Sequence, residues 1–74
     1  PEVSVVTKLE LARKRAIEER EMAEHYRGRA AGFEEVGDAE EGEIRRRWAV
    51  EADLEAEIFE DTVRRLESYE QETI

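Results

Sequence analysis

The stretch at residues 9–33, LELARKRAIEEREMAEHYRGRAAGF, decides the fold. Small and apolar residues recur in it at alternating steps of three and four, which is the spacing of one stripe along a helix. Glu19 falls in this stripe, where the pattern calls for an apolar residue. A buried carboxylate is costly unless a cation, a proton or a metal ion neutralises it, so Glu19 is a candidate functional residue. The stripe consists of Leu9, Ala12, Ala16, Ala23, Tyr26, Ala30 and Phe33.

The second half of the chain carries a wider apolar pattern, and a carboxylate, Glu55, interrupts it as well. A face of three rows is typical of the inside of a helical bundle. The rows are Trp48, Glu55, Thr62 and Tyr69; then Ala52, Phe59 and Leu66; then Ala49, Ala56 and Val63.

Two capping patterns predict where the helices begin. Thr7 is followed three residues later by Glu10, and Asp38 is followed at the same spacing by Glu41. This is the spacing of the capping box, in which a short polar side chain and a glutamate satisfy the first free backbone donors of a helix.

We therefore predict a helix over about 8–31, a turn over about 32–38 and a second helix over about 39–70. Two long helices with one short connection form an antiparallel hairpin, so the fold class is all-α and residues 1–74 form a single helical-hairpin domain. One hairpin leaves much of its apolar surface exposed. We expect a homodimer or a higher homo-oligomer that completes a four-helix bundle.

The composition excludes several classes of function. Of the 74 residues, 45% are charged and the formal net charge is −9, which argues against a nucleic acid or an anionic membrane as partner. Cysteine is absent, so disulfides and thiolate metal sites are excluded, and we expect a cytoplasmic protein. No apolar run reaches the length of a membrane span, and no nucleophile motif or glycine-rich phosphate loop is present.

The two carboxylates are expected to lie close together, because Glu19 and Glu55 are at similar distances from the turn. Glu51, four residues before Glu55, lies on the same side of its helix. A two-fold dimer would gather four to six carboxylates, whose oxygens suit iron, Mn, Mg or Ca, with a dinuclear site as one use. Tyr26 and Trp48 lie on the stripes and would shape this site.

A structural interpretation stands beside the metal site. Arginines flank the stripes, and a glutamate beside an arginine is a common structural pair that can fix the register of packed helices. These residues are Arg15, Arg20, Arg27 and Arg47.

Two segments, ARKRAIEEREMAEHYRGRA and WAVEADLEAEIFEDTVRRL, resemble the two ligand-bearing helices of the rubrerythrin-like branch of the ferritin-like superfamily. In the first segment, Glu19 precedes Tyr26 by seven residues, as a ligand glutamate precedes a tyrosine in that family. In the second segment, Ala52 and Glu55 stand where the family has the Glu and the His of its E-x-x-H pair. The half-length build is similar to the encapsulated ferritins, whose protomers are hairpins.

The resemblance implies a ferritin-like four-helix bundle with iron bound between protomers by Glu19, Glu55 and Glu51. It also implies ferroxidase-type oxidation of Fe(II) by O₂, iron storage, and an enclosing shell protein as a partner. The alternative function is a metal-free helical hairpin that acts as an assembly or adaptor element.

Overall fold

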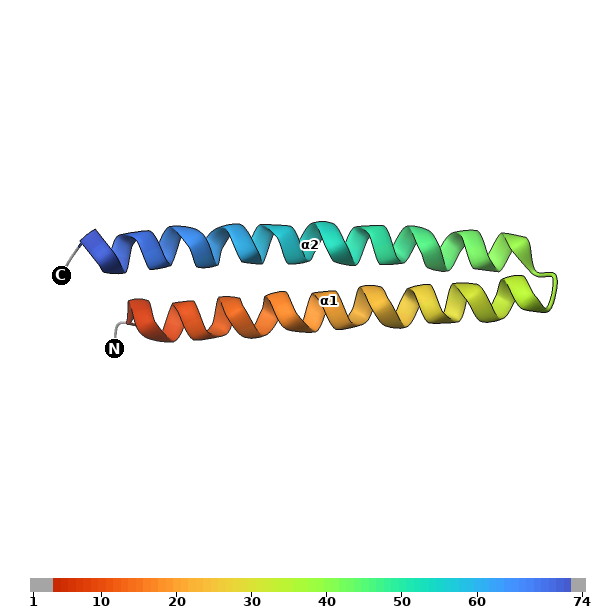
Figure 1. The fold of residues 1–74 in the computed structure, drawn as a ribbon, viewed down its shortest axis with the longest axis horizontal. Coiled ribbons are helices and arrows are strands. Elements are labelled where there is room, and N and C mark those ends of the chain that lie inside the picture. Colours follow the sequence, from red (N-terminus) through yellow and green to blue (C-terminus); the bar gives the residue numbers. More distant parts are fainter. Residues whose placement is uncertain (1–3, 73–74) are drawn as a thin grey trace.

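The protein is an antiparallel hairpin of two long helices, α1 (Val5–Glu35) and α2 (Ala39–Glu72) (Figure 1). The computed structural model describes residues 4–72, without the side chains of residues 70–72. The molecule measures 56 × 21 × 13 Å. The predicted all-α hairpin is confirmed. No helix within residues 4–72 has a segment long and apolar enough to cross a membrane.

α1 begins earlier than the sequence predicted, because Ser4 and not Thr7 caps it. Ser4 has extended backbone angles, and its hydroxyl accepts a hydrogen bond of 3.1 Å from the backbone N–H of Thr7. A serine at this position satisfies one of the free donors of the first turn. The predicted capping box of Thr7 and Glu10 is therefore wrong, and Thr7 lies inside the first turn.

The connection between the helices is shorter than the predicted turn, because α1 continues through Gly32 to Glu35. The backbone N–H of Asp38 donates to the carbonyl of Phe33 at 2.9 Å, and that of Gly37 donates to the carbonyl of Glu34 at 3.1 Å. These two bonds form a Schellman motif, in which Gly37 has a φ of 83° that favours glycine.

One of the two hydrogen bonds of the capping box predicted for α2 is confirmed, namely the bond that the Asp38 side chain accepts. The Asp38 carboxylate accepts a hydrogen bond of 3.1 Å from the backbone N–H of Glu41, and α2 starts at Ala39. The chain thus reverses within three residues.

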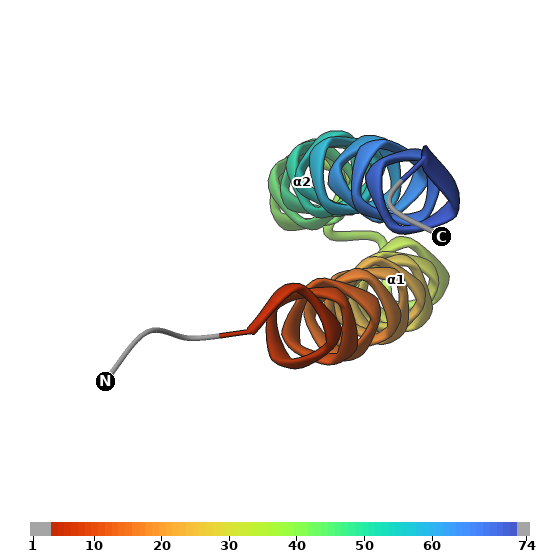
Figure 2. The same ribbon diagram turned by 90° about the vertical axis from the view of Figure 1, so that its left-hand side faces the viewer.

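The helices meet along a seam of alanines. Figure 2 shows the two helices end-on. Each buried alanine methyl contributes about 0.8 kcal/mol, against about 1.5–3 kcal/mol for a buried leucine or phenylalanine side chain. Within the described part of the chain, no large side chain is fully buried, so the core is thin. The seam consists of Leu9, Ala12, Ala16, Ala23 and Ala30 of α1 and Ala49, Ala52 and Ala56 of α2.

The seam confirms the stripe predicted for the first helix but only part of the wide face predicted for the second. Phe59, Val63 and Leu66 are half-buried beside the alanines. Trp48 and Tyr69, from the row that contains Glu55, are 40% and 55% exposed. Two helices that touch through alanines bury a narrow strip, and Trp48 and Tyr69 lie beyond its edge.

Candidate functional site

The two long sides of the hairpin differ in how their charges are paired. On one side, arginines of α1 bind carboxylates of α2, and near the turn an arginine of α2 binds a glutamate of α1. Within residues 4–69, every ion pair between the helices belongs to this ion-pair face. The face consists of Arg13, Arg20, Arg27 and Glu34 of α1 and Arg46, Asp53, Glu60 and Glu67 of α2.

Arg20 is the centre of the ion-pair face. Its guanidinium donates to Asp53 at 2.8 Å and to both carboxylate oxygens of Glu60 at 2.7 and 3.1 Å. Arg27 donates to the second oxygen of Asp53 at 2.8 Å. Hydrogen bonds from Arg20 are the main cause that lowers the pKa of both Asp53 and Glu60. In the same way, Arg46 lowers the pKa of Glu34.

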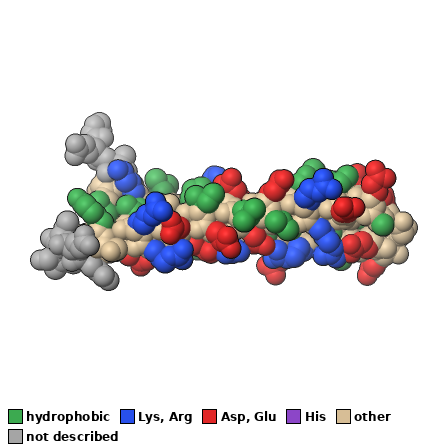
Figure 3. Space-filling model, turned by 90° about the horizontal axis from the view of Figure 1, so that it is seen from above, with side chains coloured by type: hydrophobic (Ala, Val, Ile, Leu, Met, Phe, Trp, Pro, Cys, Tyr) green, Lys and Arg blue, Asp and Glu red, His purple; other side chains and the backbone are tan. Residues whose placement is uncertain are grey.

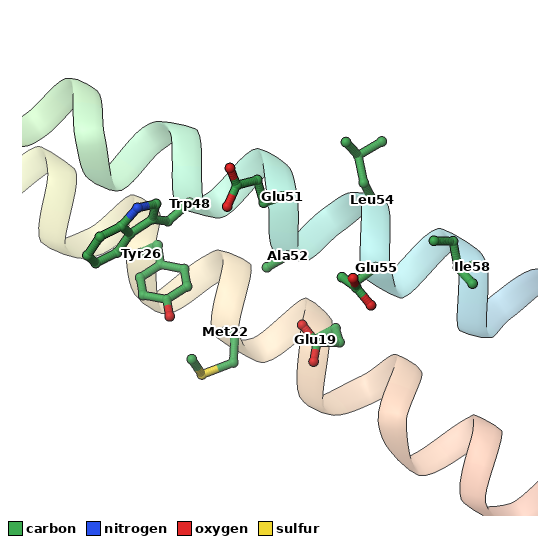
Figure 4. A pocket seen from close by; sticks show the side chains of 9 residues that line it. All are labelled: Glu19, Met22, Tyr26, Trp48, Glu51, Ala52, Leu54, Glu55 and Ile58. Carbon is green, nitrogen blue, oxygen red and sulfur yellow. The ribbon is translucent and has the colours of Figure 1, made fainter.

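The other side of the hairpin contains an open groove of about 740 Å³, and every residue that the sequence singled out for a metal site lines it (Figure 4). We refer to this side as the groove face. Its lining residues are Glu19, Met22, Tyr26, Trp48, Glu51, Ala52, Leu54, Glu55 and Ile58.

The three predicted carboxylates differ in their surroundings. The Glu19 side chain is 21% exposed, and its carboxylate lies 3.6 Å from the guanidinium of Arg15 on the same helix. Glu51 and Glu55 are exposed, and neither forms an ion pair with another described residue. The groove carboxylates thus lack the neutralising arginines from the facing helix that bind Asp53 and Glu60.

The described side chains of one chain do not assemble a metal-ligand set. Among residues 4–69, no three His, Asp or Glu side chains come together in a way that could hold a metal ion. His25, the only histidine of the chain, is exposed and has its ring beside that of Tyr26.

Near the turn, the groove ends in an aromatic cluster. The rings of Tyr26 and Trp48 meet edge to face, with centroids 5.5 Å apart. The guanidinium of Arg45 lies 4.4 Å from the Trp48 centroid and 5.5 Å from that of Phe33. Arg29 lies 5.7 Å from the same Phe33 ring. These distances are within the range of cation–π contacts.

Three apolar lining residues were missed by the sequence analysis. Met22, Leu54 and Ile58 are 42%, 54% and 62% exposed. The i, i+4 spacing of Leu54 and Ile58 was the available signal, but neither residue belongs to the seam stripes. Seen from the α2 side, hydrophobic side chains lie among acidic and basic ones along the hairpin (Figure 3).

Comparison of the chain with protein-family models, with curated proteins and with solved structures found no match. The structure is therefore the evidence for the antiparallel hairpin, and the similarity to rubrerythrin-like proteins stays a prediction.

Proposed function

We propose that the chain is an assembly element whose groove face packs against a second copy to form a four-helix bundle. The observation that supports this proposal is the separation of the two faces. Charged groups are paired across the helices on one face. The other face has exposed large apolar side chains around Glu51 and Glu55, which form no ion pair with another described residue. A second hairpin would cover those apolar side chains and thicken a core that is otherwise made of alanines.

Two isoleucines allow a matched test of this proposal. Ile58 lies on the groove face and is 62% exposed, and Ile17 lies beside Arg13 and Glu60 of the ion-pair face and is 59% exposed. Sedimentation equilibrium of the wild type should show concentration-dependent self-association. Ile58→Glu should weaken it at least about tenfold, which corresponds to about 1.4 kcal/mol. Ile17→Glu should leave it unchanged, and equal effects of the two variants would contradict the proposal.

Metal binding is the second candidate function, and the absence of interhelical arginines around Glu19, Glu51 and Glu55 supports it. In a dimer centred on Glu19 and Glu55, these carboxylates from both copies would be the ligands of iron or of Mn, Mg or Ca. Tyr26 and Trp48 would line the site. Iron oxidation and storage, with an enclosing shell protein as partner, follow only from the similarity to ferritin-like proteins.

The metal proposal is tested by equilibrium dialysis with Mn(II) and anaerobic Fe(II), together with thermal unfolding. Wild type should retain metal and unfold at a higher temperature when metal is present, because a ligand that binds only the folded state stabilises it. The double variant Glu19→Gln, Glu55→Gln should lose both effects. The control Glu24→Gln, Glu57→Gln removes the same charge from exposed positions outside the groove. Absence of bound metal in the wild type would end this proposal.

A further inference from the structure

Charges of opposite sign occupy two levels along the groove face. Arg29 of α1 and Arg45 of α2 both lie eight positions from Gly37, where they share the ring of Phe33. The Arg45 side chain is 23% exposed, and its guanidinium lies 3.6 Å from the carboxylate of Glu41 on the same helix. Glu19 and Glu55 both lie 18 positions from Gly37 and line the groove. With a rise of about 1.5 Å per residue, the two levels are about 15 Å apart.

We propose that two copies pack groove face to groove face in an antiparallel and staggered arrangement that pairs these two levels. The two-fold axis lies in the interface and is perpendicular to the helices. It passes midway between the two levels, 13 positions from Gly37. Each helix then lies antiparallel to its own counterpart. Glu19 faces Arg29 of the second copy, and Glu55 faces Arg45 of the second copy. This arrangement rests on the proposed self-assembly and identifies the partner as another molecule of this chain.

Charge selects this arrangement over the other symmetric ones. A two-fold axis along the hairpin would place both copies in parallel, so that Arg29 met Arg45 and Glu19 met Glu55. An antiparallel dimer centred on Glu19 and Glu55 would again bring carboxylates together and would need a cation between them. Like charges at an interface are costly, whereas the staggered dimer pairs opposite charges at these two levels, and each of these pairs occurs twice by symmetry.

The staggered axis also passes through the apolar part of the groove. Tyr26 and Trp48 lie two positions from its level on one side, and Met22 lies two positions from it on the other. Aromatic side chains near the centre of an interface contribute most of its binding energy. Glu51 lies one position from the axis and would approach its own counterpart, which is an unfavourable contact of this arrangement.

Charge reversal tests the arrangement in metal-free buffer containing a chelator. Glu55→Arg and Arg45→Glu should each raise the dissociation constant of the dimer about tenfold or more, since each disrupts two symmetry-related pairs. The double variant should recover most of the loss. Glu51→Gln should tighten the dimer, and Glu57→Arg should have little effect, because Glu57 is exposed and lies outside the groove.

A cross-link gives a second readout, since the chain contains no cysteine. Mixing Glu55→Cys with Arg45→Cys under oxidation should give the mixed disulfide in excess of the disulfide between two Glu55→Cys chains. A dimer that Glu55→Arg tightens, or that preferentially links two Glu55→Cys chains, overturns the staggered arrangement while the proposed self-assembly stands. A protein that stays monomeric at all concentrations overturns both.

Discussion

The ion-pair face and the groove face lie on the same two helices, but their charged side chains are paired differently. On the ion-pair face, Arg20 and Arg27 reach across the seam to Asp53 and Glu60, so the charges are satisfied within one molecule. On the groove face, the charged groups that share a level have the same sign. The difference shows that one face links the two helices, and it supports the proposal that the other face packs against a second copy.

A substitution that forces the two helices apart should have the largest effect on the free energy of unfolding. Ala23 is fully buried in the seam against Ala49 and Ala52. Ala23→Leu inserts three carbons into this contact and should lower the free energy of unfolding by about 1–3 kcal/mol. Urea unfolding followed by circular dichroism measures this change. Ala31→Leu, at an exposed position of the same helix, is the control, and an equal loss there would contradict a tight seam.

Gly28 and Gly42 should respond in opposite directions to replacement by alanine. A Cβ at Gly28 meets nothing within 4 Å, so Gly28→Ala should raise the free energy of unfolding by about 0.5–1 kcal/mol through helix propensity. A Cβ at Gly42 would lie 2.7 Å from Cγ of Glu34 and 3.2 Å from the carbonyl oxygen of Ala30. Gly42→Ala should therefore lower stability and disturb the contact of Glu34 with Arg46. Thermal unfolding of the two variants compares them, and a stabilising Gly42→Ala would show that the helices approach less closely there.

Acid should weaken the ion-pair face, with the smallest effect because its side chains are exposed and screened by solvent. The folded pKa values of Asp53 and Glu60 lie below their usual values of 3.8 and 4.5. These carboxylates therefore stabilise the hairpin above those values, and the contribution is lost as the pH falls through the lower folded values. Arg20→Gln should flatten this part of the curve of unfolding temperature against pH. A wild-type curve that is already flat between pH 5 and about pH 2 would contradict the role of Arg20.

The sequence predicted the seam well because its signal is simple. Alanines and Leu9 at steps of three and four can only form one narrow strip, and the strip is buried as expected. The row of Trp48 and Tyr69 was harder to place, since its periodicity is as regular as that of the alanines. Whether such a row is buried depends on how closely two helices approach, and that distance is a property of both helices together.

Five residues of the groove stood out in the sequence and the ion-pair face did not, for a related reason. Glu19 stood out because it interrupts an apolar stripe, whereas Asp53 and Glu60 lie among many other acids. Arg20 was recognised only as a flanking arginine, because a long side chain can reach carboxylates several residues away along the facing helix. The end of α1 just before Gly37 was similarly difficult to predict, because Gly32 is an equally plausible residue at which to end the helix. The hydrogen bonds of the Schellman motif distinguish the two glycines.

The three-residue reversal at Gly37 also governs the order in which the molecule can open. Segments close to the turn re-form quickly after separation, because little chain entropy is lost in bringing them together. Helix pairs far from the turn, near Leu9 and Leu66, can separate while the aromatic cluster around Trp48 stays formed. Amide hydrogens near Ala30 and Ala49 should consequently exchange most slowly with solvent. A partly opened hairpin would thus still present the end of the groove that contains Trp48 and Arg45.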